Sequence, residues 1–174
     1  ILSEDTDVLV LCISFCKELP CQIYQKSGTQ ARTKYVDVNK LASVLGQENC
    51  DALIGLHAIT GCDSISAFAG RGKVAALKLM KRNLEHRKAL EQLGKDWEIT
   101  AELLEKLEAF VCHVYNTKCE TTRVNDLRYQ LFCAKKGEID SWQLPPCAAA
   151  LIKHCKRANY QAAVWKRFLQ NCPN

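Results

Sequence analysis

The chain has 174 residues, of which 48% are hydrophobic and 25% are charged. This balance is typical of one globular domain, or of one domain with a helical extension, and it excludes a disordered chain. No stretch approaches the roughly 18 consecutive apolar residues of a membrane span, and no secretory leader is recognisable. We therefore expect a soluble intracellular protein without a membrane partner.

The net charge of +5 is unevenly distributed. Residues 1–69 hold five Lys and Arg against eight Asp and Glu, whereas residues 70–174 hold 19 against 11. An acidic first part and a basic second part suit a metal-binding portion beside a portion that binds a polyanion. A solvated basic surface without a partner would give the same pattern. The eleven cysteines lack CxxC spacing, which indicates reduced, buried thiols rather than disulfides or zinc ligands.

Residues 1–69 alternate predicted strands and helices, which is typical of an α/β fold. "DVLVLCISF" (residues 7–15) is apolar and β-branched, as in a strand buried on both faces of a parallel sheet. "CQIYQK" and "TKYVDV" are two shorter strands. A helix capped by Asn39 should end at Gly46, and "NCDALIGLHAIT" should form a buried helix that leads to Gly61. His57, in this apolar run, is expected to be a buried, hydrogen-bonded histidine.

Residues 73–174 have the spacing of amphipathic helices. A helix over 73–93 would turn Val74, Leu77, Met80 and Leu84 inward and Lys78, Lys81 and Arg82 outward. Thr100 should cap a second helix, and a last helix should run from Pro146 to Asn171. We expect a core over residues 1–93 with a helical extension over 94–174 packed on it. Trp97, Trp142 and Trp165 are expected to serve packing.

Two acidic motifs and two glycines carry the predicted chemistry. Asp5 and Asp7 flank Thr6, and two carboxylates this close repel unless a cation such as Mg²⁺ or Mn²⁺ lies between them. Asp63 could reach the same ion from the end of the buried helix. Gly70 and Gly72 would then offer open backbone amides to a phosphate, with Arg71 and Lys73 adding positive charge.

These motifs, in this order, resemble the flap endonuclease superfamily of PIN-like 5′ nucleases. The resemblance covers about residues 1–90, from "ILSEDTDVLVL" to "ITGCDSISAFAGRGKVAALKLM". It implies a partial PIN-like parallel sheet and a glycine-containing helix-turn-helix that grips DNA. It also implies metal-dependent nuclease activity, with Asp5, Asp7 and Asp63 as catalytic metal ligands and Mg²⁺ or Mn²⁺ as cofactor. A nuclear location would follow from a DNA partner.

The sequence departs from that family in two ways. Members bring further acidic ligands from a first strand and from a helix before the Asp-x-Asp turn, and nothing upstream of Ile1 supplies them, so we expect an N-terminally truncated chain. Ser64 stands where an aromatic residue commonly follows the third acid. The helical remainder resembles nuclease-like reading frames associated with mobile elements.

Several alternatives remain beside the nuclease. An inactive module could bind nucleic acid through Arg71, Lys73, Lys78, Lys81 and Arg82, and a helical interaction scaffold would bind none. A haloacid-dehalogenase phosphatase also has an Asp-x-Asp signature, but Ser3 and Glu4 interrupt the apolar strand that it requires. "AGRGKV" is not a P-loop, because Val74 stands where Ser or Thr should bind magnesium.

Overall fold

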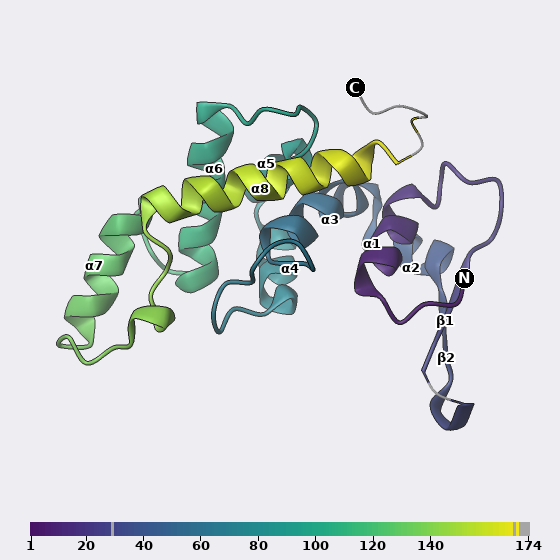
Figure 1. The fold of residues 1–174 in the computed structure, drawn as a ribbon, viewed down its shortest axis with the longest axis horizontal. Coiled ribbons are helices and arrows are strands. Elements are labelled where there is room, and N and C mark those ends of the chain that lie inside the picture. The colour runs from purple at the N-terminus through teal and green to yellow at the C-terminus, as the bar shows by residue number, and fades with distance from the viewer. Residues whose placement is uncertain (29, 169, 171–174) are drawn as a thin grey trace.

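The structure, a computed structural model, describes residues 1–28, 30–168 and 170. This part of the chain is mostly helical with one small antiparallel sheet, a mixed α/β composition. The helices form one body, from which the β-hairpin projects (Figure 1). Within these residues, no helix is both long and apolar enough to cross a membrane. The elements in chain order are α1 (Thr6–Phe15), β1 (Tyr24–Ser27), η1 (Gln30–Arg32), β2 (Lys34–Asp37), α2 (Val38–Leu45), α3 (Gln47–Ile59), α4 (Lys73–Arg82), α5 (Leu84–Gln92), α6 (Ala101–Tyr115), α7 (Val124–Ala134), η2 (Ser141–Gln143) and α8 (Ala148–Lys166).

The segment predicted as a buried strand, residues 7–15, is helix α1, so that prediction was wrong. A short apolar run suits a buried strand and a buried helix equally well. The local cap favours the helix here, because the Asp5 side chain accepts the backbone N–H of Asp7 at 2.8 Å. Val10 and Ile13, one turn apart, are then buried in the core.

The two short strands were predicted correctly, but they do not form the expected parallel sheet. β1 and β2 pair antiparallel, with Tyr24 opposite Asp37. Among the described residues, the parallel pairing found is a single bridge between Leu2 and Lys26. With α1 helical, the part of the chain that the structure describes has no long apolar strand on which a parallel sheet could be built.

Helices α2 and α3 follow the sequence prediction, apart from one cap. Asp37, rather than Asn39, caps α2 by accepting the N–H of Lys40 at 2.9 Å. The Asn39 side chain instead accepts the N–H of Ile23, which ties the helix to the hairpin. Gly46 ends α2 as predicted. Helix α3 is buried at every position from residue 52 to residue 59, because α1, α5 and α8 all pack against it.

The single helix predicted over residues 73–93 is divided into α4 and α5. Asn83 leaves the helical conformation and caps α5 by accepting the N–H of His86 at 3.1 Å. The inward face of α4 carries the buried Ala76 and Met80, and Leu77 and Leu79 pack against the core while partly buried. Val74 and Leu84, which were predicted to point inward, are exposed.

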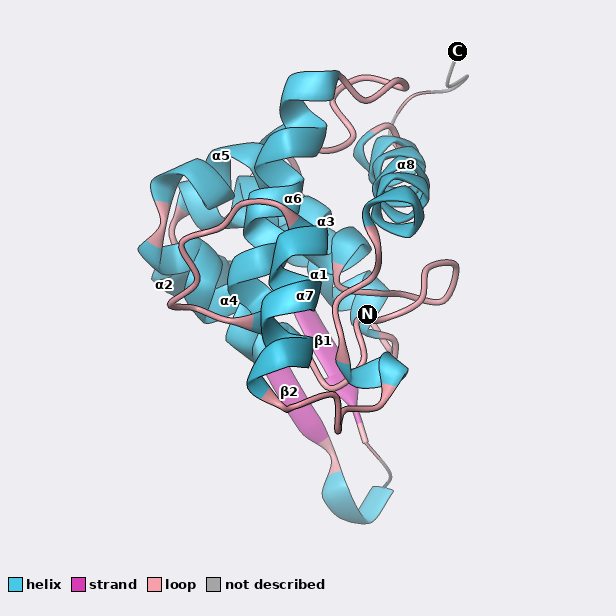
Figure 2. Cartoon of the chain, turned by 90° about the vertical axis from the view of Figure 1, so that its left-hand side faces the viewer, coloured by secondary structure: helices cyan, strands magenta, loops and turns pink. Residues whose placement is uncertain are grey.

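The second half of the chain packs on the first. Thr100 caps α6 as predicted, whereas α7 was not predicted. Helix α8 begins two residues after Pro146 and packs against α3. Figure 2 shows α8 nearly end-on, at one side of the other helices. The prediction that this helix runs to Asn171 was wrong, because α8 ends at Lys166 and Arg167 is its C-cap. One buried cluster draws apolar side chains from both halves, and the boundary at residue 93 stays a prediction.

Candidate functional site

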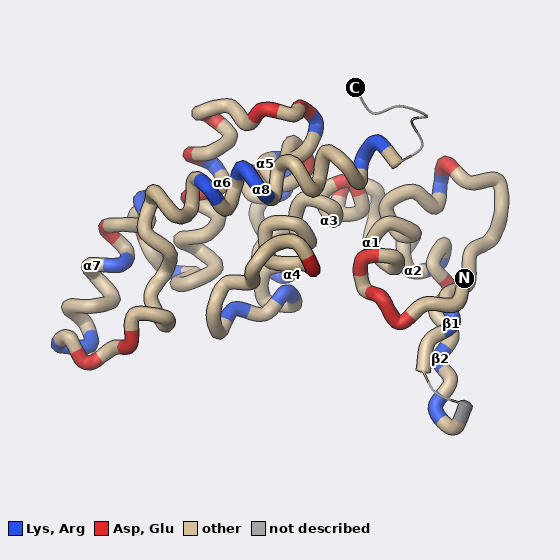
Figure 3. The backbone as a smooth tube through the Cα atoms, viewed as in Figure 1, with Lys and Arg blue, Asp and Glu red and all other residues tan. Residues whose placement is uncertain are grey.

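The two N-terminal aspartates occupy different positions at the start of α1. Asp5 is the N-cap, and its carboxylate is engaged by the backbone of the first helical turn. Asp7 lies two residues further on, in the first turn of α1, and points toward α3. Its side chain is 21% exposed. Figure 3 shows the acidic positions of this N-terminal segment next to α1.

Asp7 begins a chain of contacts that joins three segments far apart in the sequence. Its Oδ1 lies 2.6 Å from Nε2 of His57 on α3. The other ring nitrogen of His57, Nδ1, lies 2.9 Å from Nζ of Lys73, the first residue of α4. Lys73 also donates to the carbonyl oxygen of Gly61. Helix α1, the end of α3 and the start of α4 are thereby held together.

The order of donors and acceptors in this chain follows from its chemistry. An ammonium group only donates, so Nδ1 of His57 accepts from Lys73 and Nε2–H donates to the Asp7 carboxylate. His57 is thus a neutral imidazole between a carboxylate and an ammonium. Burial lowers the pKa of His57, although Asp7 acts in the opposite direction, and burial likewise lowers the pKa of Lys73. The prediction of a buried, hydrogen-bonded His57 is confirmed, since the side chain is 4% exposed.

The C-terminal helix covers this chain of contacts. The Trp165 ring of α8 stacks on His57, with ring centroids 5.6 Å apart and an interplanar angle of 29°. Water is thereby kept from one face of the imidazole, consistent with the lowered pKa of His57. The role of Trp165 in packing, predicted from the sequence, is confirmed.

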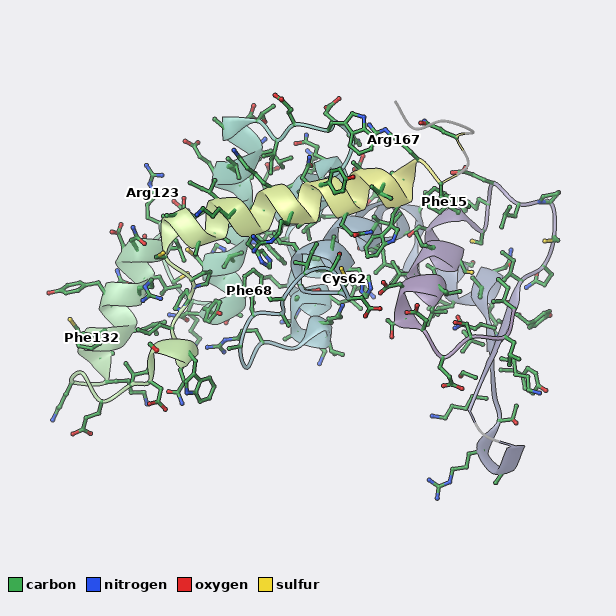
Figure 4. The ribbon with its side chains drawn as sticks, viewed as in Figure 1. Phe15, Cys62, Phe68, Arg123, Phe132 and Arg167 are labelled. Carbon is green, nitrogen blue, oxygen red and sulfur yellow. The ribbon has the colours of Figure 1, made fainter. Side chains whose placement is uncertain are left out.

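Asp63 lies at the tip of a tight turn after α3. Cys62 and Ile65 exchange backbone hydrogen bonds of 2.9 and 3.1 Å, which leaves Asp63 and Ser64 exposed. Figure 4 labels Cys62 on this turn. Ser64 donates to Oε1 of Gln161 on α8 at 2.7 Å, so the turn is anchored to the C-terminal helix.

The segments that carry Asp7 and Asp63 therefore meet at Lys73. This lysine contacts His57, the partner of Asp7, and also the carbonyl oxygen of Gly61, which lies two residues before Asp63. The three acids do not form a complete ion site by themselves. Among residues 1–28, 30–168 and 170, no group of three or more His, Cys, Asp and Glu side chains is placed to hold a metal ion. The carboxylate oxygens suit Mg²⁺ or Mn²⁺ chemically, but Asp5 already caps α1 and Asp7 already binds His57. The acids present do not fit a whole metal centre.

The glycine loop is open, while its two cations turn inward. A Cβ added at Gly70, where φ is +66°, or at Gly72 would meet no atom within 4 Å. The Arg71 guanidinium lies over the Tyr115 ring, 4.8 Å from its centroid, and Lys73 contacts His57. Lys78, Lys81 and Arg82 on α4 are exposed, as the sequence predicted.

Sequence reasoning did not foresee the pairing of Asp7 with His57 and Lys73. Asp7 and His57 are 50 residues apart, and neither has a sequence neighbour that indicates the other. The one available signal was a lone histidine in an otherwise apolar helix, which must find a polar partner when it is buried.

Comparison with known proteins found no family model, no curated protein and no solved structure that matches this chain.

Proposed function

We propose that this chain binds the phosphodiester backbone of nucleic acid, with DNA as the first candidate, through the Gly70–Lys73 loop and helix α4. The observation that carries this proposal is the charge of residues 64–84, which contain five cations and no carboxylate. Three of these cations, Lys78, Lys81 and Arg82, are exposed on the two last turns of α4. Phosphate contacts of this kind supply most of non-specific nucleic-acid affinity.

The backbone of the loop supports the same function. Helix α4 follows Gly72, which has no side chain over the first turn, so a phosphate can approach the first free N–H groups directly. Arg71 and Lys73 hold the loop in place from behind rather than face outward. In this proposal Arg71 and Lys73 position the loop. The helix-turn-helix that resembles that of the flap nucleases would consist of α4 and α5.

Salt dependence tests this interface. We expect the double variant Lys78→Ala/Lys81→Ala to bind a DNA duplex with a single-stranded flap more weakly, and the slope of log affinity against log salt to become shallower by about 2. The matched control is Lys106→Ala, which removes a partly exposed lysine of α6 that pairs with Glu102 at 2.6 Å. Fluorescence anisotropy across a salt series measures the affinity and its salt slope for each variant. An unchanged slope in the double variant contradicts the interface on α4.

A second candidate function is metal-dependent cleavage of the bound strand, in which Asp7 and Asp63 take part. The contacts of Lys73 with His57 and Gly61 favour this function, because they bring the two acidic segments together beside the glycine loop. The remaining ligands would have to come from groups that the described residues do not supply.

Cleavage is tested with the longest natural form of the protein, Mn²⁺ and flapped DNA. Asp63→Ala is expected to lower the rate at least about 100-fold, which corresponds to the loss of about 3 kcal/mol of transition-state stabilisation. Asp140→Ala, which removes another exposed aspartate at a turn, should leave the rate unchanged. Equal rates for the two variants would exclude Asp63 from the reaction. Binding without any metal-dependent product would instead support the inactive module.

A further inference from the structure

A cavity of about 250 Å³ lies under the first turns of α8, beside the glycine loop. Its walls come from residues 66–69 before the loop, from the end of α6, from η2 and from α8. Phe68, on the loop between α3 and α4, lies beneath α8 in Figure 4. The volume falls just below the range of about 300–1,000 Å³ that holds drug-sized ligands, so it suits one flat ring system.

The floor of the cavity is a packed aromatic cluster. The rings of Phe68 and Tyr115 meet edge to face with centroids 6.1 Å apart, and those of Phe68 and His154 lie 4.7 Å apart. All three side chains are 6% exposed. A floor held in this way is already formed before a ligand arrives, which lowers the entropic cost of binding.

One wall is an aromatic ring that the fold does not cover. Trp142 of η2 lines the cavity yet remains 60% exposed. The prediction that Trp142 serves packing was therefore wrong. A large apolar ring at the mouth of a small aromatic cavity offers a flat face on which another ring can stack.

The cavity also presents a hydrogen-bond donor and an acceptor. Nε2 of His154 lies 2.8 Å from the carbonyl oxygen of Ile59, so this nitrogen carries the hydrogen and Nδ1 is an acceptor. Burial lowers the pKa of His154, which keeps the ring neutral. Arg157, one helical turn along α8, is exposed at the rim and supplies donors and positive charge. None of the described residues that line the cavity is acidic.

We propose that this cavity holds one unstacked nucleobase of a strand whose backbone lies along the Gly70–Lys73 loop. The inference rests on the proposed backbone binding, because Ala69 lines the cavity and directly precedes Gly70. A nucleobase has π faces for Trp142 and an edge with both donors and acceptors for His154 and Arg157. An aromatic side chain of a peptide matches the faces but brings no phosphate for the surrounding cations.

The test compares a single-stranded thymidine oligonucleotide with an abasic oligonucleotide of the same length, at low salt and without metal. Trp142→Ala is expected to weaken binding of the thymidine strand by about 5- to 150-fold, the loss of one stacked base at about 1–3 kcal/mol, and to leave the abasic strand unaffected. Ala150→Leu, which fills the cavity and keeps Trp142, should have the same selective effect. The control is Tyr129→Ala, which removes an exposed aromatic ring from α7 and should change neither affinity.

The outcomes separate the cavity from the backbone interface. If Trp142→Ala loses the same affinity for the thymidine and the abasic strand, or loses none for either, the nucleobase site is overturned. The proposed phosphate contacts would not be affected by that result. If the abasic strand fails to bind the unmodified protein, the backbone proposal fails. The cavity is then judged with thymidine monophosphate, whose quenching of tryptophan fluorescence should disappear in Trp142→Ala. Absence of quenching, or equal quenching by N-acetyl-tyrosinamide, would overturn the nucleobase site.

Discussion

Replacing Gly55 by alanine is expected to destabilise the protein by about 2 kcal/mol. Gly55 lies in the middle of α3, where alanine would ordinarily stabilise a helix by about 1 kcal/mol. Here the added Cβ would lie 2.0 Å from the carbonyl oxygen of Leu90 and 3.2 Å from the Cβ of Leu93. The first of these atoms belongs to the backbone of α5, so the clash can be relieved only by moving one helix away from the other. Overpacking of this kind costs about 1–3 kcal/mol and sometimes more, which outweighs the gain in helix propensity.

The matched control is Gly72→Ala, the same chemical change in open space. Gly72 has a φ of −79°, which any residue can adopt, and an added Cβ would meet nothing within 4 Å. Urea denaturation at neutral pH measures both variants. We expect the midpoint of Gly72→Ala to stay close to that of the unmodified protein, while Gly55→Ala unfolds at much lower urea or fails to fold. A Gly55→Ala protein with an unchanged midpoint would mean that α3 and α5 do not pack as closely as described.

Acidification is expected to destabilise the protein through His86. This residue of α5 is 4% exposed, and its Nε2 lies 3.0 Å from Nδ1 of His113 on α6. Burial, and secondarily the neighbouring His113, lowers the pKa of His86 from 6.5 to about 4. Well above pH 6.5 the ring is neutral in both the folded and the unfolded chain, so it contributes nothing to the pH dependence there. Between pH 6.5 and about 4 the unfolded chain binds a proton that the folded chain rejects, and stability falls by about 2 kcal/mol at pH 5.

The variant His86→Gln isolates this contribution, because glutamine keeps a hydrogen-bonding group near His113 but does not titrate. The free energy of unfolding is measured by urea denaturation at pH 7.5 and pH 5.0 for both proteins. The unmodified protein should lose about 2 kcal/mol more than the variant over this interval. The buried His57 and His154 are present in both, so their effects cancel in the difference. Equal losses in the two proteins would show that His86 titrates normally.

Local sequence signals predicted the helices whose ends are encoded nearby. Thr100 caps α6, and Gly46 ends α2, because a hydroxyl at an N-cap and a glycine with positive φ each act on backbone groups within a few residues. The same rules misjudged α1 and α4. Residues 7–15 suited a strand and a helix equally, and the break at Asn83 was hidden within a helical hydrophobic pattern.

Of the candidate site, the sequence supplied the residue types and their order. It located the acids Asp5, Asp7 and Asp63, the open glycines at 70 and 72, and the outward lysines of α4. It could not show that Lys73 points at His57, because the direction of a long side chain depends on which buried polar group lies within its reach. The exposed ring of Trp142 was misassigned for a related reason, since burial is decided by what packs above a residue and not by its own type.

By itself, then, the sequence determined the local conformation at well-marked caps and the distribution of charge along the chain. The tertiary structure alone decided that α1, the end of α3 and the start of α4 meet through Asp7, His57 and Lys73, and that a cavity forms beneath α8. The physical reason is the distance along the chain over which each effect acts. Caps and charges act within a few residues, whereas the burial that pairs a carboxylate, an imidazole and an ammonium comes from helices separated by dozens of residues.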